Sequence, residues 1–265
     1  MKNVLIVGYG VVGKNLHKEL SKLNPDIYDK YNQAYNTKKD IKYDFAFICV
    51  DTPKTEDSSN DISEVINAIR DNDAKIYIIK STILPGTVEN LTIMFLEESL
   101  RKCRTNELAK HIVFSPEYYG GTQHCNNFEF NFTILGGEKS DCLKVQQLLQ
   151  HVYDARHSFR IVSAKLAELV KYMENSWLAT KVSFCNQFYQ IAQEYAVRYE
   201  ELRELFILDP RVNPSHTFVD DESPYWDSHC LNKDVPAIAE AVDAELLKAV
   251  IEFNKKQKEK HKTGN

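Results

Sequence analysis

The sequence predicts an α/β protein in which a Rossmann-type, doubly wound, mainly parallel sheet is followed by a long helix and a small helical dimerisation domain. Short apolar runs of strand composition alternate with amphipathic stretches through the first 162 residues, as in a parallel sheet covered by helices. A glycine-rich turn directly follows the first run. Helical periodicity replaces the alternation from residue 163, so the expected domains are residues 1–162 and 163–265.

Seven runs have the composition of strands, at residues 4–7, 27–28, 45–50, 76–79, 112–114, 132–135 and 159–162. Helices are expected at residues 11–23, 61–71, 87–102 and 139–151. The segment from residue 163 to about 206 contains neither proline nor glycine, which predicts one helix of roughly 60 Å. An irregular stretch at 208–229 is expected to lead to a final helix at about 242–258.

Composition and charge exclude several classes of protein. The 265 residues carry a formal net charge of -5, which gives no reason to expect a nucleic-acid partner. The sequence contains no apolar run of the ~18 residues that a membrane span needs and begins without a signal peptide, so we expect a cytoplasmic protein. The six cysteines are scattered and lack the spacing of a zinc site, so no metal is expected.

The glycine-rich turn has the sequence Gly8-Tyr9-Gly10-Val11-Val12-Gly13 and lies between the first predicted strand and the first predicted helix. In this context small residues let the backbone approach a pyrophosphate at the helix N-terminus. The loop residues expected to bind the cofactor are Gly8, Gly10, Val11, Val12 and Gly13. Asp29 ends the second predicted strand, where its carboxylate can accept both ribose hydroxyls and repel a 2′-phosphate. NAD is therefore favoured over NADP, and the alternative is a tight turn without a ligand.

Six further segments follow in one order along the chain: Val50-Asp51-Thr52-Pro53; Lys80-Ser81-Thr82 with Pro85-Gly86-Thr87; Ser115-Pro116-Glu117; Ala167-Glu168-Leu169-Val170-Lys171-Tyr172 with Asn175; Asp209-Pro210-Arg211; and Cys230-Leu231-Asn232-Lys233-Asp234. In these segments and their order the chain resembles the UDP-glucose and GDP-mannose dehydrogenase family. The resemblance covers nearly the whole chain. It extends over about the first two thirds of a typical member, which implies that the C-terminal domain for the donor nucleotide is missing.

Members of this family oxidise the primary alcohol of a nucleotide sugar to a carboxylate, with two hydride transfers to NAD. The resemblance implies that Cys230 is the nucleophile, that Lys171 and Asn175 stabilise an oxyanion, and that Asp234 activates water. It places Thr82 beside the water and Glu117 beside the catalytic centre. The residues that it assigns to the cofactor are Val50, Thr52 and Thr82. Those that it assigns to the substrate are Arg211 and Lys233.

The residues themselves leave simpler interpretations open. Lys171 and Asn175 are four apart and share one helix face, which can be an ordinary solvated face. Asp234 can be a helix N-cap, and Thr82 and Glu117 can be capping or turn residues. Cys230 has a lysine and a carboxylate nearby, in what we predict to be a loop before a helix.

The chain departs from the family pattern in several places, which include Asn232 where a proline is usual and a longer stretch from Arg211 to Cys230. Pro224-Tyr225-Trp226-Asp227-Ser228-His229 stands where the family usually has glycines, and Gly120-Gly121 replaces a charged pair. These changes alter the expected sugar pocket. Two alternative functions therefore remain, a catalytically silent NAD-binding dimeric protein and a two-electron dehydrogenase of the β-hydroxyacid type. In each case we expect a homodimer through the long helix, whose apolar stripe outruns its own domain.

Overall fold

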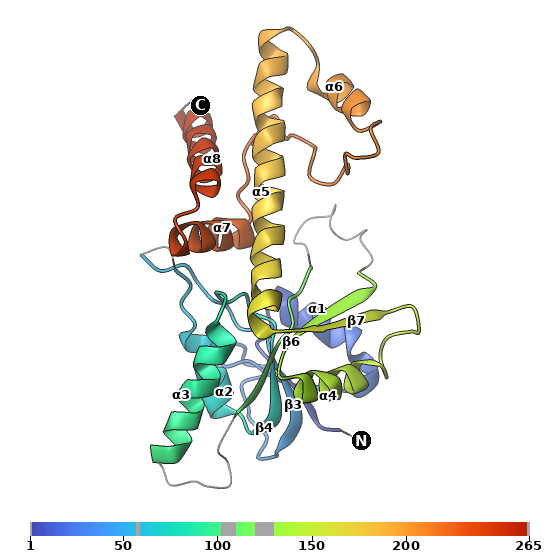
Figure 1. Cartoon of the computed structure of the whole chain (residues 1–265), viewed down its shortest axis with the longest axis vertical. Coiled ribbons are helices and arrows are strands. Elements are labelled where there is room, and N and C mark those ends of the chain that lie inside the picture. Colours follow the sequence, from blue (N-terminus) through green and yellow to red (C-terminus); the bar gives the residue numbers. More distant parts are fainter. Residues whose placement is uncertain (1, 57–58, 102–109, 120–129, 264–265) are drawn as a thin grey trace. The chain divides into compact units, whose positions relative to one another are not determined.

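The computed structural model describes residues 2–56, 59–101, 110–119 and 130–263 (Figure 1). The chain divides into two compact units. The first comprises Met1–Pro53 and Asn60–Lys171, and the second comprises Lys54–Ser59 and Tyr172–Asn265. The division falls within the helix α5, Ala164–Glu194, whose first two turns belong to the first unit.

The first unit is built on a seven-stranded sheet with the order β2-β1-β3-β4-β5-β6-β7. Its strands are β1 Val4–Val7, β2 Asp26–Tyr28, β3 Tyr43–Ile48, β4 Ala74–Ile79, β5 His111–Phe114, β6 Phe132–Gly137 and β7 Ser158–Val162. Every neighbouring pair is parallel except β5 and β6. All seven predicted strands are present, and the mainly parallel, doubly wound sheet is confirmed.

Helices cover both faces of this sheet (Figure 1). They are α1 Val11–Glu19 with the short 3-10 turn η1 Ser21–Leu23, α2 Ser63–Asp71, α3 Thr87–Arg101 and α4 Lys139–Leu149. Successive strand residues point to opposite faces. Leu5 therefore joins the core beneath α2 and α3, whereas Ile6 joins the core beneath α1 and α4. The central strands β1, β3 and β4 are mostly apolar because both of their faces are largely buried.

The first turns of α5 pack on the same face as α2 and α3, through Ala164 and Ala167. Gly136 on β6 permits this approach, because a Cβ at that position would lie 2.5 Å from the Cβ of Ala167. The sheet thereby positions the start of the helix that carries Lys171.

The second unit is helical. It consists of the rest of α5 with α6 Tyr199–Phe206, α7 His229–Ala241 and α8 Glu245–Thr263. One core cluster contains Ala179, Trp226, Leu231, Val235 and Val250, and so joins α5, α7 and α8. Among the described residues, none of the helices combines the length and apolarity needed to cross a bilayer.

The prediction of one helix running to about residue 206 is wrong, because α5 ends at Glu194 after 31 residues, a length of about 46 Å. Ala196 adopts a left-handed conformation with φ 52°. The N–H of Ala196 donates to the Gln193 carbonyl at 3.0 Å, and that of Val197 donates to the Ala192 carbonyl at 2.8 Å. This pair of bonds is a Schellman motif, in which glycine usually takes the left-handed position. Alanine there left no signal in the sequence.

The prediction of an irregular stretch up to residue 229 followed by a single helix is also incomplete. The helix α7 begins at His229, and the Ser228 side chain caps it by accepting the N–H of Leu231 at 3.2 Å. Pro236 lies inside this helix, although proline normally interrupts one. The final helix begins at Glu245 and extends beyond the predicted end near residue 258.

Candidate cofactor and catalytic site

Two glycines of the loop between β1 and α1 are required by close backbone packing. Gly8 has φ +90°, and a Cβ there would lie 2.7 Å from the carbonyl oxygen of Cys49. A Cβ on Gly13 would lie 2.0 Å from the carbonyl oxygen of Gly8. Side chains at these positions would push the loop away from β3 and separate α1 from the loop.

Gly10 has a different environment. A Cβ built there meets no atom within 4 Å. Gly10 is the N-cap of α1, and no side chain caps the N–H groups of the first turn. The first-turn residues Val11, Val12 and Gly13 therefore lie at the positive end of the helix dipole with no side-chain cap on the helix. This arrangement fits the pyrophosphate of a dinucleotide.

Asp29 is fixed beside the same loop. Its two carboxylate oxygens accept the backbone N–H of Tyr9 at 2.7 Å and that of Tyr31 at 2.9 Å. Each carboxylate oxygen retains a further lone pair for a ligand hydroxyl. A ribose diol fits this acceptor, whereas a 2′-phosphate would meet its negative charge, so the residues present fit NAD.

The ends of β3 and β4 bring three further predicted contacts together. The Thr52 hydroxyl donates to the Thr82 carbonyl at 3.0 Å, and the Ser81 hydroxyl donates to the Val50 carbonyl at 2.5 Å. These two bonds join the segment after β3, which carries Val50 and Thr52, to the segment after β4, which carries Thr82. Both segments lie at the carboxyl ends of the strands, where doubly wound proteins bind ligands.

Glu117 follows β5 at this edge, and its carboxylate accepts the N–H of Tyr119 at 2.7 Å. Lys171 is buried, and its ammonium lies 5.0 Å from the centre of the Tyr118 ring. This places Lys171 beside the Glu117 segment within the first unit and away from a solvated face. A cation over an aromatic ring is favourable, which helps to hold the ammonium there.

Lys80 is a further, partly buried cation that sequence reasoning did not single out. Its ammonium donates to the Ser115 hydroxyl and to the Pro116 carbonyl, both at 3.3 Å. Burial lowers the pKa of Lys80, and the positive charge of Lys171 acts in the same direction. The only sequence signal for this environment was a lysine directly after an apolar strand. Many exposed lysines share this pattern, so it does not indicate burial.

The second unit contains a buried polar cluster around Asp234. The Asp234 carboxylate is fully buried, and it accepts the Asn175 amide at 2.7 Å and the Lys233 ammonium at 2.6 Å. Asn175, Lys233 and Asp234 are thus brought together from α5 and α7. Asp234 lies within α7, so the interpretation of it as an N-cap is wrong, because Ser228 caps that helix.

Cys230 is half-buried in the first turn of α7 and lies one turn before Asp234, on the same side of the helix. The prediction of a loop position is therefore wrong. A helix N-terminus favours a thiolate. None of the cysteines in the described ranges forms a disulfide. Burial raises the pKa of both Cys49 and Cys142 to about 12, which makes these two thiols poor nucleophiles.

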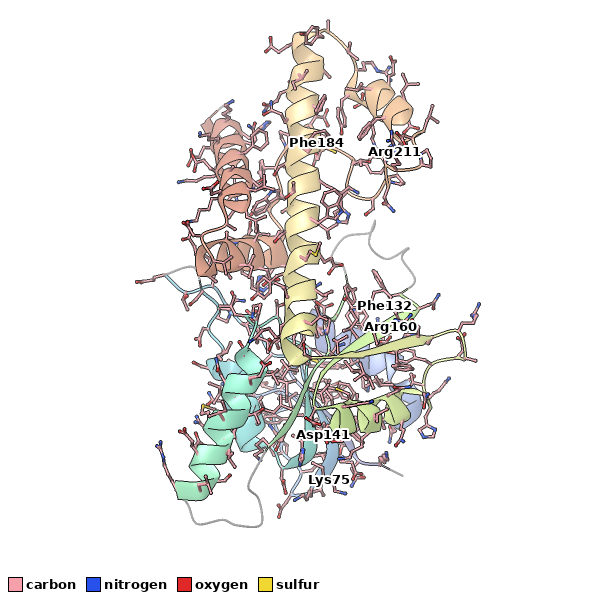
Figure 2. All side chains as sticks on the ribbon, in the orientation of Figure 1. Lys75, Phe132, Asp141, Arg160, Phe184 and Arg211 are labelled. Carbon is pink, nitrogen blue, oxygen red and sulfur yellow. The ribbon has the colours of Figure 1, made fainter. Side chains whose placement is uncertain are left out.

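Arg211 is exposed on the segment that follows α6 (Figure 2). Its guanidinium is paired with Asp209 at 2.6 Å. The role of Arg211 at a neighbouring subunit's sugar stays a prediction. Gly120 and Gly121, the replaced charged pair, lie outside the described residues.

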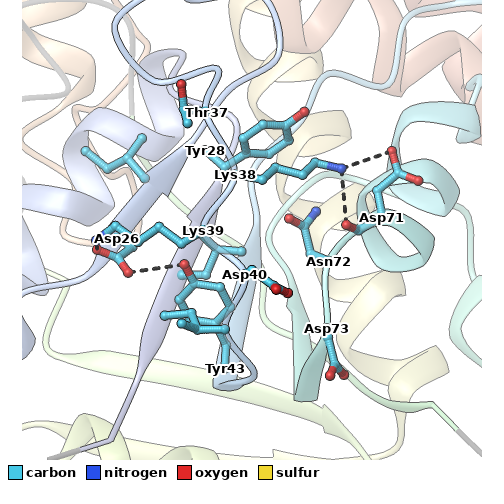
Figure 3. A pocket seen from close by; sticks show the side chains of 13 residues that line it. Asp26, Tyr28, Thr37, Lys38, Lys39, Asp40, Tyr43, Asp71, Asn72 and Asp73 are labelled. Atoms are coloured by element: carbon cyan, nitrogen blue, oxygen red, sulfur yellow. Dashed lines mark hydrogen bonds and ion pairs between the residues drawn. The ribbon is translucent and has the colours of Figure 1, made fainter.

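A pocket of about 280 Å³ opens at the amino-terminal ends of the strands, opposite to the glycine loop (Figure 3). It lies at the first residues of β2 and β3, Asp26 and Tyr43, whose side chains are hydrogen bonded at 3.1 Å. Lys38 closes one side through an ion pair with Asp71 at 3.4 Å. Because the glycine loop is at the carboxyl ends of the strands, this pocket is not part of the candidate site.

Two consecutive stretches of the chain match one protein family. Residues 15–157 match the NAD binding domain of the UDP-glucose/GDP-mannose dehydrogenase family, and residues 165–256 match the central domain of that family. Asp29 lies within the matched NAD-binding domain, and the glycine loop lies directly before the first matched residue.

The GDP-mannose 6-dehydrogenase of Pseudomonas aeruginosa is 28% identical over 231 residues, which cover 82% of this chain and 52% of that protein. The UDP-glucose 6-dehydrogenase of Rickettsia prowazekii is 26% identical over 227 residues, or 80% of this chain and 49% of that protein. The chain spans about half the length of these curated relatives.

A UDP-glucose dehydrogenase structure from the archaeon Pyrobaculum islandicum has the same fold, with a TM-score of 0.76 and 22% sequence identity over 96% of this chain and 68% of that one. The family matches cover most of the sequence and both structural units. The chain therefore belongs to the UDP-glucose/GDP-mannose dehydrogenase family.

Proposed function

We propose that the protein is an NAD-dependent dehydrogenase that oxidises the primary alcohol of a nucleotide sugar to a carboxylate. The observation that carries this proposal is the buried cluster of Asn175 from α5 with Lys233 and Asp234 from α7, the helix whose first turn holds Cys230. A carboxylate held by two donors one turn from a half-buried thiol suits covalent catalysis. The oxidation also requires an electron acceptor, and the NAD-binding domain supplies the site for it.

In this proposal NAD supplies the two-electron acceptor for each of the two oxidation steps. The Cys230 thiolate attacks the carbonyl carbon of the intermediate aldehyde and forms a carbon–sulfur bond. The thiohemiacetal is then oxidised to a thioester, and water cleaves the carbon–sulfur bond, which releases the acid and returns the thiol. A thiol is suited to this sequence because a thioester hydrolyses readily.

Asn175 and Asp234 suit the two polar tasks of this reaction. The amide of Asn175 has two N–H donors, and one of them is used by Asp234. The other can donate to the oxyanion that forms on the substrate. Asp234 can accept a proton from the attacking water. We assign Lys171 to the oxyanion, Thr82 to the water and Glu117 to the surroundings of the reacting carbon, as the resemblance implies.

The substrate class follows from the family and from two predicted contacts, Arg211 and Lys233. A nucleoside diphosphate carries negative charge that the exposed guanidinium of Arg211 can neutralise, whereas the ammonium of Lys233 is buried beside Asp234. The segment before Cys230 carries aromatic and charged side chains instead of glycines, so we propose that the sugar pocket differs from the usual one. The catalytic chemistry uses thiols, which the reducing cytoplasm preserves.

We also propose that two copies associate through α5. Large apolar side chains on one side of this helix are exposed, namely Leu166, Leu169, Met173, Trp177, Phe184 and Phe188. Their spacing of three, four and seven residues forms a continuous stripe, which is called the α5 stripe below. Large contiguous apolar surfaces of this kind mark interaction sites.

The variant Cys230→Ser tests the covalent mechanism. We expect it to lose acid formation while it binds NAD as tightly as the wild type, because a serine hydroxyl at this position lacks the nucleophilicity of a thiolate. Acid would be quantified by mass spectrometry, and NAD affinity by calorimetric titration. Cys185→Ala, which changes a buried thiol of the same unit, serves as the matched control.

Unchanged acid formation by Cys230→Ser would exclude the covalent mechanism. One NADH per alcohol without acid in the wild type would instead support the two-electron dehydrogenase. NAD binding by the wild type without NADH formation across a panel of alcohols and UDP- and GDP-sugars would support a catalytically silent protein.

A further inference from the structure

Trp226 lies four residues before Cys230, and its backbone is anchored by one side chain. Its N–H donates to Asn254 Oδ1 at 2.8 Å, and the Asn254 amide donates to the Trp226 carbonyl at 2.9 Å. Both backbone polar groups of a 5% exposed residue are thereby satisfied by a single amide on α8. The side-chain amide of Asn254 thus provides the two backbone hydrogen bonds that a neighbouring strand provides in a sheet.

The indole of Trp226 is fixed independently of its backbone. Its Nε1–H donates to the Ser183 hydroxyl on α5 at 3.0 Å. The ring lies in the apolar cluster that includes Leu231 and Val235 of α7 and Val250 of α8. Trp226 therefore joins three helices of the second unit, and a rigid ring of this kind loses little conformational entropy when it is held.

The residues between this anchor and Cys230 are also held. Asp227 accepts the Asn232 amide at 2.7 Å and forms an ion pair with Lys258 of α8. Ser228 caps the first turn of α7. The position of the first turn of α7 therefore depends on contacts with α8 and α5 as well as on its own hydrogen bonds.

We propose that Trp226 and Asn254 are positioning residues, which hold the first turn of α7 so that the Cys230 thiol has one fixed location. The inference rests on the proposed role of Cys230 as nucleophile. Glycines would leave this segment many backbone conformations, whereas Trp226 fixes it in the interior of the second unit. A reacting thiol gains rate from such placement, because small displacements of a nucleophile cost large factors in rate.

Two variants loosen the anchor by different routes. Asn254→Ala removes both hydrogen bonds to the Trp226 backbone, and Trp226→Phe keeps an aromatic ring but removes the bond to Ser183. We expect each to lower kcat by about tenfold, with KM and NAD affinity within twofold of wild type. In the same variants a looser segment exposes the half-buried thiol, so alkylation of Cys230 by iodoacetamide should accelerate at least threefold.

Gln257→Ala is the matched control, because it removes a buried amide from α8 whose partner is Gln190. It should leave both the alkylation rate and kcat within twofold of wild type. A merely structural role for Trp226 would lower the unfolding midpoint without these opposite changes in thiol reactivity and turnover. Site-specific alkylation would be followed by peptide mass spectrometry on the full chain.

Unchanged alkylation and turnover in folded Trp226→Phe and Asn254→Ala would overturn this inference, even where Cys230→Ser abolishes acid formation and the proposed function stands. If Asn254→Ala does not fold, Ser183→Ala replaces it, since that variant removes only the acceptor of the indole N–H. Retained acid formation by Cys230→Ser would remove the proposed function itself, whatever the anchor variants do.

Discussion

The three glycines of the cofactor loop have different physical roles although they belong to one motif. Gly8 and Gly13 are surrounded by backbone atoms at distances that no Cβ tolerates. Gly10 faces open space, and its lack of a side chain matters only for a ligand that approaches the N-terminus of α1. Substitutions at Gly10 and Gly13 therefore separate folding from cofactor binding.

We expect Gly13→Ala to destabilise the fold by about 3 kcal/mol, because its methyl group would overlap the carbonyl oxygen of Gly8. Gly10→Ala should change the free energy of unfolding by less than about 1 kcal/mol and should weaken NAD binding at least tenfold. Urea unfolding and calorimetric titration measure the two effects. Wild-type NAD affinity in Gly10→Ala would contradict binding of the NAD pyrophosphate at this loop.

Residue-level prediction from the sequence was possible where the signal was local. The glycine loop and Asp29 have fixed spacing along the chain, and the structure brings them together through the bond from Tyr9 to Asp29. The surroundings of Lys80 and the anchoring of Trp226 left no comparable signal. Both depend on segments distant in the sequence, so the composition around them does not reveal them.

At the scale of elements, the start of α5 is joined to the start of α3 by one carboxylate. Glu168 is fully buried, and it accepts the N–H of Gly86 at 2.6 Å and that of Val88 at 2.9 Å. It thereby satisfies donors at the N-terminus of α3 from another helix. Glu168 lies one turn before Lys171, so this contact also fixes the helix that carries the catalytic candidate.

Burial raises the pKa of Glu168 to about 7 from an ordinary value near 4.5, against the lowering effect of its two backbone donors. Glu89 on α3 raises this pKa further, and Lys165 on α5 lowers it. Folding therefore favours the protonated carboxyl. Its contribution to stability is complete below pH 4.5 and is lost as the pH rises through about 7.

The glutamine side chain of the variant Glu168→Gln has no titratable group. The stability of the wild type relative to this variant should therefore fall between pH 4.5 and pH 7, by at most about 3 kcal/mol. Urea unfolding of both proteins across this range measures the difference. Glu97→Gln, an exposed carboxylate change on α3, is the control and should show little slope. A difference independent of pH would show that Glu168 does not titrate in this range.

The elements of the sheet could be predicted because each strand is a short apolar run with its own boundaries. The helical part was harder, since the end of α5 depends on a left-handed alanine at 196 and α7 contains Pro236. Both features contradict average residue preferences. They are stabilised by the packing of the second unit, which the local sequence does not encode.

At the scale of the whole molecule, the buried polar cluster of the second unit combines residues that are far apart in the sequence. The four-residue spacing of Lys171 and Asn175 predicted a shared helix face. The bond between Asn175 and Asp234 spans 59 residues and could be expected only through the family resemblance. Spacing along one helix is thus predictable, whereas partners on another helix require the fold.

The α5 stripe sets the last expectation. Its side chains include Met173, which is 75% exposed, and Trp177, which is 60% exposed. Phe184 continues the stripe further along the helix (Figure 2). A second copy of the same helix would cover this apolar surface symmetrically, as a two-fold interface requires. The same side chains would otherwise remain in water at a cost of about 25 cal/mol for each Å² of apolar surface.

We therefore expect the 30.6 kDa chain to sediment as a dimer and Met173→Glu to shift it toward the monomer, because the interface would bury two unpaired carboxylates. Gln193→Glu introduces the same charge near the end of α5 outside the stripe and should leave the dimer intact. Sedimentation velocity over a range of concentrations distinguishes the two species. A wild-type protein that stays monomeric at every concentration would mean that something other than a second copy covers the stripe.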